Sequence, residues 1–322
     1  MKAIVQHEYG SADVLEYSEI DKPEIGDEEV LVGVRAAGIH IGDWLVMNGL
    51  PYVIRAMGYG LGKPKNKVLG TDVAGRIEEI GGNVTQFQPG DEVFGWGTGA
   101  FAEYAAVSEE ALVLKPANVT FEQAAAVPVS AFAALEGVRD EGEVQPGQKV
   151  LVIGASGGVG SFSVQIAKSW GAEVTGVAST RNLEMVRSIG ADTVIDYTRD
   201  EITEGGQHYD VIIDTAGNRS LSELRRALTP QGTLVVIGGS GGRWLMGSGR
   251  SLRAMMLSPF VSQTLRTFIS TPNRKDLLEL KGFVESEEVT PVIDRTYPLD
   301  HVADAMRYIG ERHTQGKTVI TV

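Results

Sequence analysis

A glycine-rich turn between an apolar run and a helical pattern limits the fold of this chain more than any other feature of its sequence. Residues 150–153 read Val-Leu-Val-Ile, and the turn Gly-Ala-Ser-Gly-Gly-Val-Gly follows at 154–160. Ala155, Gly157 and Gly160 match the spacing G-x-G-x-x-G, with alanine in the first place. In a strand–turn–helix unit such a turn lets the backbone approach a pyrophosphate, and the helix N-terminus offers it free N–H groups. We therefore predict a dinucleotide-binding site, in preference to a tight turn that binds nothing.

Beyond residue 120, short apolar runs alternate with helical patterns. Strands are predicted at 150–153, 174–177, 193–195, 211–213 and 234–237, with a possible sixth at 265–269. Helices are predicted at 159–170, 183–189 and 221–228. This alternation is typical of βαβ units with right-handed crossovers around a parallel sheet. The tail adds helices at 275–284 and 302–309 and strands at 292–293 and 318–322.

The first third of the chain has a different pattern, which predicts β structure. Short runs rich in valine and isoleucine, bounded by glycine or proline, lie at 29–36, 72–77, 91–94 and 101–107. Closely spaced strands of this kind indicate a compact, barrel-like domain. A capping-box pattern, Thr120 followed by Gln123, predicts a helix through Ala126 where the pattern changes. A length of 322 residues agrees with two domains.

The end of the second predicted parallel strand indicates which nucleotide is bound. Proteins that use NADH usually carry an acidic residue there, about 20 residues after the glycine turn, to hold the ribose 2′-OH. This chain has Ser179, Thr180 and Arg181 instead. Two hydroxyls and a guanidinium suit a 2′-phosphate, although helix capping and a solvated charge are the alternative roles. We predict NADPH.

Composition excludes several functions. The chain has no cysteine, so disulfides, thiolate nucleophiles and cysteine-based zinc sites are impossible. A net charge of −13 makes nucleic acid and anionic membranes poor partners. We find no signal segment at Met1–Glu8, and the weakly polar stretch 124–135 is interrupted by Pro128 and Ser130. We expect a soluble, cytoplasmic protein.

Several ordered motifs, spread over nearly the whole length, resemble those of the medium-chain dehydrogenase/reductase superfamily, specifically its zinc-free, quinone-oxidoreductase-like branch. These motifs lie at 90–95, 99–104, 124–128, 154–160, 190–197 and 316–320. The resemblance implies an α/β protein in which residues 1–120 and 271–322 form a GroES-like β-barrel catalytic domain. Residues 121–270 would form a Rossmann domain with a doubly wound parallel sheet, and the active cleft would lie between the two domains. It also implies a homodimer joined through the nucleotide-binding domains; a segment 243–262 folded over the sheet edge is the alternative.

The resemblance also implies further contacts with NADPH. The pyrophosphate would be bound by the glycine turn, with Ser156, Gly158 and Val159 as donors beside Gly157 and Gly160. Tyr197 would stack near the adenosine, or is otherwise a surface aromatic. The ends of the fourth and fifth parallel strands would approach the ribose and nicotinamide, unless they are simple turns; these residues are Ala216, Gly217, Gly238 and Gly239.

Zinc ligands of metal-dependent relatives are missing. His40 stands where those relatives carry their first cysteine ligand, and Thr71 stands where they carry histidine. His40 and Asp43 alone are too few for a site that needs three protein ligands. We therefore expect no metal and interpret His40 as a hydrogen-bonded histidine of the cleft.

A reductase without a metal needs an acceptor that is already electrophilic. Quinones and α,β-unsaturated carbonyl compounds (enones) take hydride at carbon and delocalise the charge onto oxygen. The resemblance places candidate pocket residues at His40, Asp43, Trp44, Tyr52, Phe94 and Trp96, with Tyr52 and His40 as candidate donors to the acceptor oxygen. Core packing is the alternative for Trp44 and Phe94, and helix capping or orientation of a partner for Asp43. Residues 252–260, with Arg253, Ser258 and Phe260, are predicted as an insertion that roofs the cleft.

Two other functions stay open. A zinc-free carbonyl or alcohol dehydrogenase would need a dedicated acid, such as a tyrosine–lysine pair. A non-catalytic NADPH-binding sensor would retain the fold and bind the nucleotide without turnover.

Overall fold

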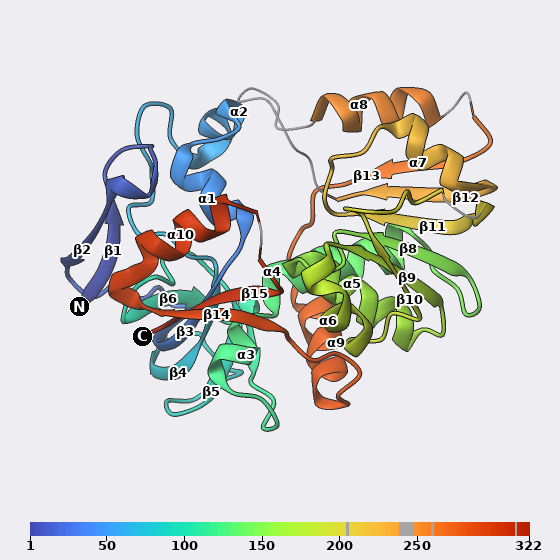
Figure 1. Cartoon of the computed structure of the whole chain (residues 1–322). Helices are drawn as coiled ribbons and strands as arrows, with labels where there is room; N and C mark the ends of the chain where they lie inside the picture. The colour runs from blue at the N-terminus through green and yellow to red at the C-terminus, as the bar shows by residue number, and fades with distance from the viewer. Residues whose placement is uncertain (204–205, 238–247, 259–260, 313) are drawn as a thin grey trace. The chain divides into compact units, whose positions relative to one another are not determined.

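The computed structural model describes residues 1–203, 206–237, 248–258, 261–312 and 314–322 (Figure 1). The chain divides into two compact units. Unit 1 comprises Met1–Ser130, Pro272–Glu287 and Pro291–Val322, and unit 2 comprises Ala131–Thr271 and Glu288–Thr290. Both ends of the chain therefore contribute to unit 1. Within the described residues, no helix is both long and apolar enough to cross a membrane.

Unit 2 is built on a six-stranded sheet in which every neighbouring pair is parallel, in the order β10-β9-β8-β11-β12-β13. Its strands are β8 (Lys149–Ile153), β9 (Glu173–Ala178), β10 (Thr193–Asp196), β11 (Tyr209–Asp214), β12 (Leu228–Val236) and β13 (Thr264–Thr267). The helices α5 (Gly158–Ser169), α6 (Leu183–Ser188) and α7 (Leu221–Ala227) follow β8, β9 and β11. The predicted doubly wound α/β fold and its sixth strand are confirmed.

The segment predicted to roof the cleft contains a helix that packs on the sheet. Helix α8 (Ser248–Leu257) connects β12 to β13, and Ala254 is fully buried in the same core cluster as Leu234 and Leu265. Ser258 Oγ accepts a hydrogen bond from the Leu265 N–H at 3.1 Å. One side of the helix is thus used by the sheet, and a role of this segment as a roof of the cleft stays a prediction. Phe260 lies outside the described residues.

Unit 1 contains a seven-stranded sheet in the order β14-β15-β3-β4-β5-β7, with β6 also paired to β3, and a separate pair of strands. The sheet strands are β3 (Glu29–Ile39), β4 (Asp72–Ile80), β5 (Glu92–Trp96), β6 (Tyr104–Ser108), β7 (Leu112–Leu114), β14 (Ile293–Pro298) and β15 (Lys317–Thr321). The pair is β1 (Lys2–Gln6) and β2 (Leu15–Glu19), which the sequence patterns did not reveal. Figure 1 shows the last strands, in red, beside the blue β3, as the antiparallel pairing of β15 with β3 requires.

The helices of unit 1 are α1 (Ile41–Asn48), α2 (Tyr52–Ile54), α3 (Phe121–Ala125), α9 (Arg274–Glu285) and α10 (Val302–Gly310), and α4 (Pro128–Glu136) crosses the division. The predicted capping box begins α3: Thr120 Oγ1 accepts from the Gln123 N–H, and Gln123 Oε1 accepts from the Thr120 N–H. Helix α3 contacts β3, β4, β5 and β15. Residues 121–130 therefore lie in unit 1, whereas the sequence placed them in the nucleotide-binding domain.

Candidate functional site

The glycine turn joins β8 to α5 at the carboxyl end of the parallel sheet. Gly154 has a φ of 81°, a left-handed conformation that favours glycine. The N–H groups of Gly154 and Ala155 both donate to the carbonyl of Val177, which ties the turn to the end of β9. A Cβ at position 160 would lie 2.0 Å from the carbonyl oxygen of Gly154. Helix and turn therefore pack as closely as the sequence pattern predicts.

The N-terminus of α5 has the properties of an anion site. Gly157 is its N-cap, and no acidic side chain lies in its first turn. The first N–H groups of a helix have no partner inside the helix, and the helix dipole makes this end positive. Ser156, Gly157, Gly158 and Val159 are all half-buried, so the turn is accessible. A Cβ at position 157 would approach only the Gly154 carbonyl oxygen, at 3.4 Å. This turn fits the pyrophosphate of a dinucleotide.

Residues at the end of β9 meet the turn and the end of β10. Asn182, which is 4% exposed, donates from Nδ2 to Ser156 Oγ at 2.9 Å. Thr180 donates from Oγ1 to Asp196 Oδ2 at 2.5 Å, while Ser179 is half-buried and Arg181 is exposed. The Thr180 hydroxyl proton is therefore directed at a carboxylate, which weakens its predicted part in binding a 2′-phosphate.

An acidic residue reaches this region from β10. Asp196 is 5% exposed, and the hydrogen bond from Thr180, together with those from Thr198, lowers the pKa of its carboxyl. Its charge faces Arg199, whose Nε lies 3.8 Å away. The sequence pattern places no acidic residue at the end of the second parallel strand, β9. The carboxylate comes from the end of the third strand, β10, which sequence reasoning missed. Tyr197, the predicted adenosine contact, is 48% exposed beside it.

The end of β11 forms a second turn near the glycine loop. Asp214 is fully buried, and its Oδ1 accepts from the N–H groups of Ala216 and Gly217 at 3.2 and 3.0 Å. Thr215 donates from Oγ1 to the Ile153 carbonyl at 2.8 Å, which places the ends of β11 and β8 together. Gly238 and Gly239, predicted to serve the same nucleotide, lie outside the described residues.

In unit 1, His40 and Asp43 form a pair at the start of α1. The His40 N–H donates to Asp43 Oδ2 at 3.0 Å, so Asp43 takes part in capping α1 as the capping-box partner of the N-cap residue His40. His40 Nε2 lies 3.4 Å from Asp43 Oδ2, and it has no hydrogen-bond partner among the described residues. At that separation the two groups are near each other without a good hydrogen bond. Asp43 Oδ1 accepts from Thr71 Oγ1 at 3.3 Å.

A buried ion pair lies beside this histidine and aspartate. Lys317 on β15 donates from Nζ to Asp72 Oδ2 on β4 and to Ser130 Oγ, both at 3.1 Å. Asp72 and Lys317 are 0% and 2% exposed, and Asp72 Oδ1 also accepts from the Val129 N–H. Burial raises the pKa of Asp43, and the Asp72 charge adds to that rise while His40 and Lys317 oppose it. Sequence reasoning missed this ion pair, for which a lysine in the closing strand was the one signal.

The aromatic candidates divide between helices and β5. Trp44 lies on α1 and packs against the core of unit 1. Tyr52 begins α2, where the Arg55 guanidinium lies 4.8 Å from its ring centre. Phe94 and Trp96 lie on β5, where Phe94 is 1% exposed and Trp96 is paired in register with Asp72. The structure thus brings Trp96 close to the ion pair and leaves Phe94 in the core.

Among the described residues, no group of three or more histidine, aspartate or glutamate side chains is placed to hold a metal ion. The position that corresponds to a second zinc ligand is Thr71, whose hydroxyl donates to Asp43.

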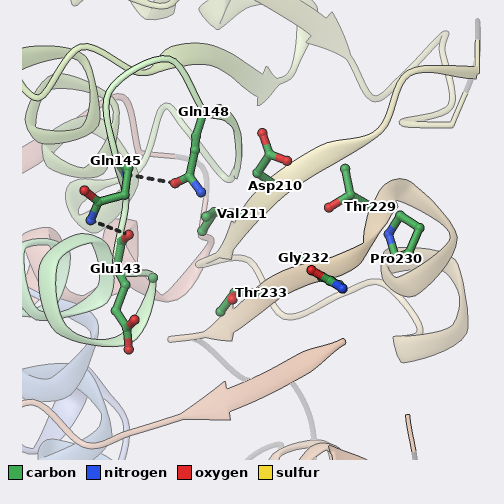
Figure 2. Close-up of a pocket in the computed structure, with 11 residues that line it drawn as sticks. Glu143, Gln145, Gln148, Asp210, Val211, Thr229, Pro230, Gly232 and Thr233 are labelled. Carbon is green, nitrogen blue, oxygen red and sulfur yellow. Dashed lines mark hydrogen bonds between the residues drawn. The ribbon is translucent and has the colours of Figure 1, made fainter. Parts of the chain in front are cut away.

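Figure 2 shows a hollow at the opposite, amino-terminal edge of the parallel sheet. Its volume is about 710 Å³, and it is lined by polar residues that include Glu143, Gln148 and Asp210. These groups already have partners: Glu143 pairs with Arg266, Gln148 accepts from the Gln145 N–H, and Asp210 accepts from the Lys149 N–H. We do not assign a ligand to this hollow.

Comparisons with known proteins agree with this geometry. Residues 26–117 match the alcohol dehydrogenase GroES-like domain, and residues 189–320 match the zinc-binding dehydrogenase family. A chloroplastic NADPH-dependent alkenal/one oxidoreductase of Arabidopsis thaliana is 35% identical, over 99% of this chain and 79% of its own length. A quinone oxidoreductase of Pseudomonas aeruginosa is 31% identical, over 97% of both chains. The structure of a quinone oxidoreductase from Coxiella burnetii superposes with a TM-score of 0.87 at 25% identity, over 100% of this chain and 99% of the other.

Proposed function

The chain belongs to the quinone-oxidoreductase-like branch of the medium-chain dehydrogenase/reductase family, and from that premise we propose that it reduces quinones or α,β-unsaturated carbonyl compounds with NADPH. It is an oxidoreductase. The glycine turn at the N-terminus of α5 carries the proposal, because Gly157 and Gly158 are only half-buried and the first turn of the helix contains no acidic residue. The activities named for the two sequence relatives support the acceptor class.

The residues of unit 2 would hold NADPH through charge and backbone donors. The N–H groups of Gly158, Val159 and Gly160 begin α5 and would bind the pyrophosphate. The exposed Arg181 would bind the 2′-phosphate, with Ser179 as a second donor. When bound, NADPH supplies the hydride that reduces the acceptor carbon.

The residues of unit 1 would orient the acceptor. His40 is the favoured donor to the acceptor oxygen, because its Nε2 is buried and has no hydrogen-bond partner among the described residues. Asp43 fixes the backbone of His40 through a hydrogen bond to its N–H. Tyr52 is the second candidate donor, and Trp44 and Trp96 are the candidate aromatic walls, whereas Phe94 is buried in the core. Because a conjugated acceptor needs only positioning and one hydrogen bond, we propose that the reaction is independent of zinc.

The decisive experiment follows the loss of NADPH absorbance with a quinone and with an enone as separate acceptors. We expect turnover with at least one of them and no effect of exhaustive chelation. Binding of NADPH without turnover by any member of a broad acceptor panel would favour the sensor. Turnover of simple alcohols or ketones instead would favour the zinc-free dehydrogenase.

That last alternative has one sequence feature in its favour, since Tyr59 and Lys63 have the spacing of a tyrosine–lysine pair. The chain turns between them at Gly60, where φ is 106°. They therefore do not lie one turn apart on a regular helix, and we favour the conjugated acceptor.

Cofactor preference has its own test. Arg181→Ala should weaken NADPH binding by about tenfold or more, because a charge-assisted hydrogen bond is worth about 1.5–3 kcal/mol. NADH binding should change by less than about twofold, since NADH lacks the phosphate that the guanidinium binds. Equal affinities of the native protein for NADPH and NADH in a fluorescence titration would contradict the 2′-phosphate assignment.

We also propose a homodimer and a cytoplasmic location. The dimer proposal rests on family resemblance and on the sheet edge at β13, since sheet edges are usually covered or paired. Light scattering should give about twice the chain mass of 34.5 kDa. A single-chain mass that persists as concentration rises would refute the dimer. The location is tested by fractionating the source cells.

A further inference from the structure

Asn182 has a buried side-chain amide that makes no hydrogen bond to the helix that it begins, α6. It is the N-cap of α6, where asparagine usually accepts a hydrogen bond from the first turn, yet its side chain makes no such bond. Its Nδ2 instead donates to Ser156 Oγ, 26 residues earlier in the chain. The side chain is therefore directed at the glycine turn and away from the helix it begins.

The contact determines what the Ser156 hydroxyl can do. Because Asn182 donates to Ser156 Oγ, the oxygen acts as the acceptor and the serine keeps its own proton for another partner. Ser156 is half-buried within the turn that precedes Gly157 and α5. An anion at the start of α5 would be within the same turn, so it is the natural partner for that proton.

The oxygen of the same amide does not explain why the side chain is buried. Asn182 Oδ1 is buried and has no hydrogen-bond partner among the described residues. The amide therefore leaves its oxygen and one of its two N–H groups without a partner, and Ser156 Oγ is the one partner that the described residues give it. A buried amide with unsatisfied groups contributes little to the stability of the fold. Its hydrogen bond to Ser156 must therefore account for the presence of asparagine at this position.

We propose that Asn182 is a positioning residue of the nucleotide site. It orients the Ser156 hydroxyl so that this group donates a hydrogen bond to the pyrophosphate of NADPH. The inference rests on the proposed function, because it requires NADPH at the glycine turn. It adds that the segment after β9 acts at two points of the nucleotide: Arg181 on the 2′-phosphate and Asn182, through Ser156, on the pyrophosphate.

The test compares two ligands by calorimetry on the full chain. NADPH carries the pyrophosphate, whereas adenosine 2′-monophosphate carries the adenosine and 2′-phosphate without it. Asn182→Ala should weaken NADPH about tenfold, the loss of one good hydrogen bond to a charged group. It should leave adenosine 2′-monophosphate within about twofold of the native value. Asn182→Asp keeps the side-chain shape but should weaken NADPH further, because a carboxylate accepts the serine proton and adds negative charge beside the phosphates.

A double-mutant cycle with Ser156→Ala separates this role from a structural one. If Asn182 acts through Ser156, then Asn182→Ala in the Ser156→Ala background should change NADPH affinity by less than about twofold. An effect that persists in full in that background, or equal losses for the two ligands, would overturn the inference, and so would an unchanged NADPH affinity in Asn182→Asp. Failure of the native protein to bind NADPH at all would overturn the proposed function itself, and this inference with it.

Discussion

The glycine turn of unit 2 and the charged cluster of unit 1 use different parts of the chain. The charged cluster consists of His40, Asp43, Asp72 and Lys317. The turn uses backbone: small residues, a positive φ at Gly154 and the free N–H groups of α5. The cluster uses buried side chains, with Lys317 and Asp72 almost fully excluded from solvent. A backbone site is tolerant of side-chain loss but not of added bulk. A buried charge cluster tolerates neither the loss of one of its charges nor the addition of another, because either change leaves a buried charge without a partner.

The two regions also differ in how far apart their parts lie in the sequence. The turn and the helix it serves are contiguous, from Gly154 to α5. The ion pair joins residues 245 positions apart and depends on β15 pairing with β3, which in turn pairs with β4. The cluster therefore forms only when the strands of unit 1 are paired, whereas the turn and its helix are contiguous in sequence and are tied to the neighbouring strand β9 through the Val177 carbonyl.

The largest effect is expected at the ion pair. Lys317→Met should lower the free energy of unfolding by about 3–5 kcal/mol, because it leaves the Asp72 carboxylate buried without its counter-charge. Adding Asp72→Asn should recover much of that loss, since the amide oxygen can still accept from the Val129 N–H. Urea unfolding followed by circular dichroism measures both.

An exposed ion pair of unit 2 gives the matched control. Lys168 and Asp192 are 41% and 37% exposed, so Lys168→Met should cost less than about 1 kcal/mol. Similar losses for Lys317→Met and Lys168→Met would show that burial does not distinguish the two pairs. A double variant no more stable than Lys317→Met would show that the uncompensated charge is not the cause.

The next effect is expected in the glycine turn, where two positions separate packing from ligand approach. Gly160→Ala should cost about 1–3 kcal/mol of stability, because its Cβ would collide with the Gly154 carbonyl oxygen. Gly157→Ala has an ordinary contact at 3.4 Å and should change stability by less than about 0.5 kcal/mol. It should nevertheless weaken NADPH, because the added methyl group lies where the backbone would approach the pyrophosphate.

Unfolding in the absence of nucleotide and calorimetry with NADPH measure the two properties separately. A Gly160→Ala protein as stable as the native one would contradict the close packing. Unchanged NADPH affinity in Gly157→Ala would show that the phosphate does not approach that residue.

The same contrast explains how much the sequence could predict. The βαβ units, the glycine turn and even the sixth strand were recognisable because each depends on a short pattern of apolar residues and glycine. The packing of helix α8 on the sheet was not predicted, because its sequence pattern does not show which surface it covers. Asp196 beside Thr180, and Lys317 beside Asp72, could not be paired from sequence, since strand order determines which distant residues become neighbours. The role of Asn182 was hidden for the same reason: its side chain contacts Ser156 and not its own helix.

The smallest effect is a pH dependence that arises in the cluster. Burial raises the pKa of Asp43 above the ordinary value that it has in the unfolded chain. In the pH range between those two values the folded state binds more protons than the unfolded state, so stability falls as pH rises through that range. The slope for one group cannot exceed about 1.4 kcal/mol per pH unit. The native protein should therefore lose stability relative to Asp43→Asn as pH rises from the ordinary aspartate pKa toward neutrality.

Because His40, Asp72 and Lys317 all face Asp43, the comparison is repeated in a His40→Gln background, which removes any contribution from the imidazole. Urea unfolding of the four proteins across this range gives the difference directly. A difference that is independent of pH, or that has the opposite sign, would show that the cluster keeps Asp43 charged in spite of its burial.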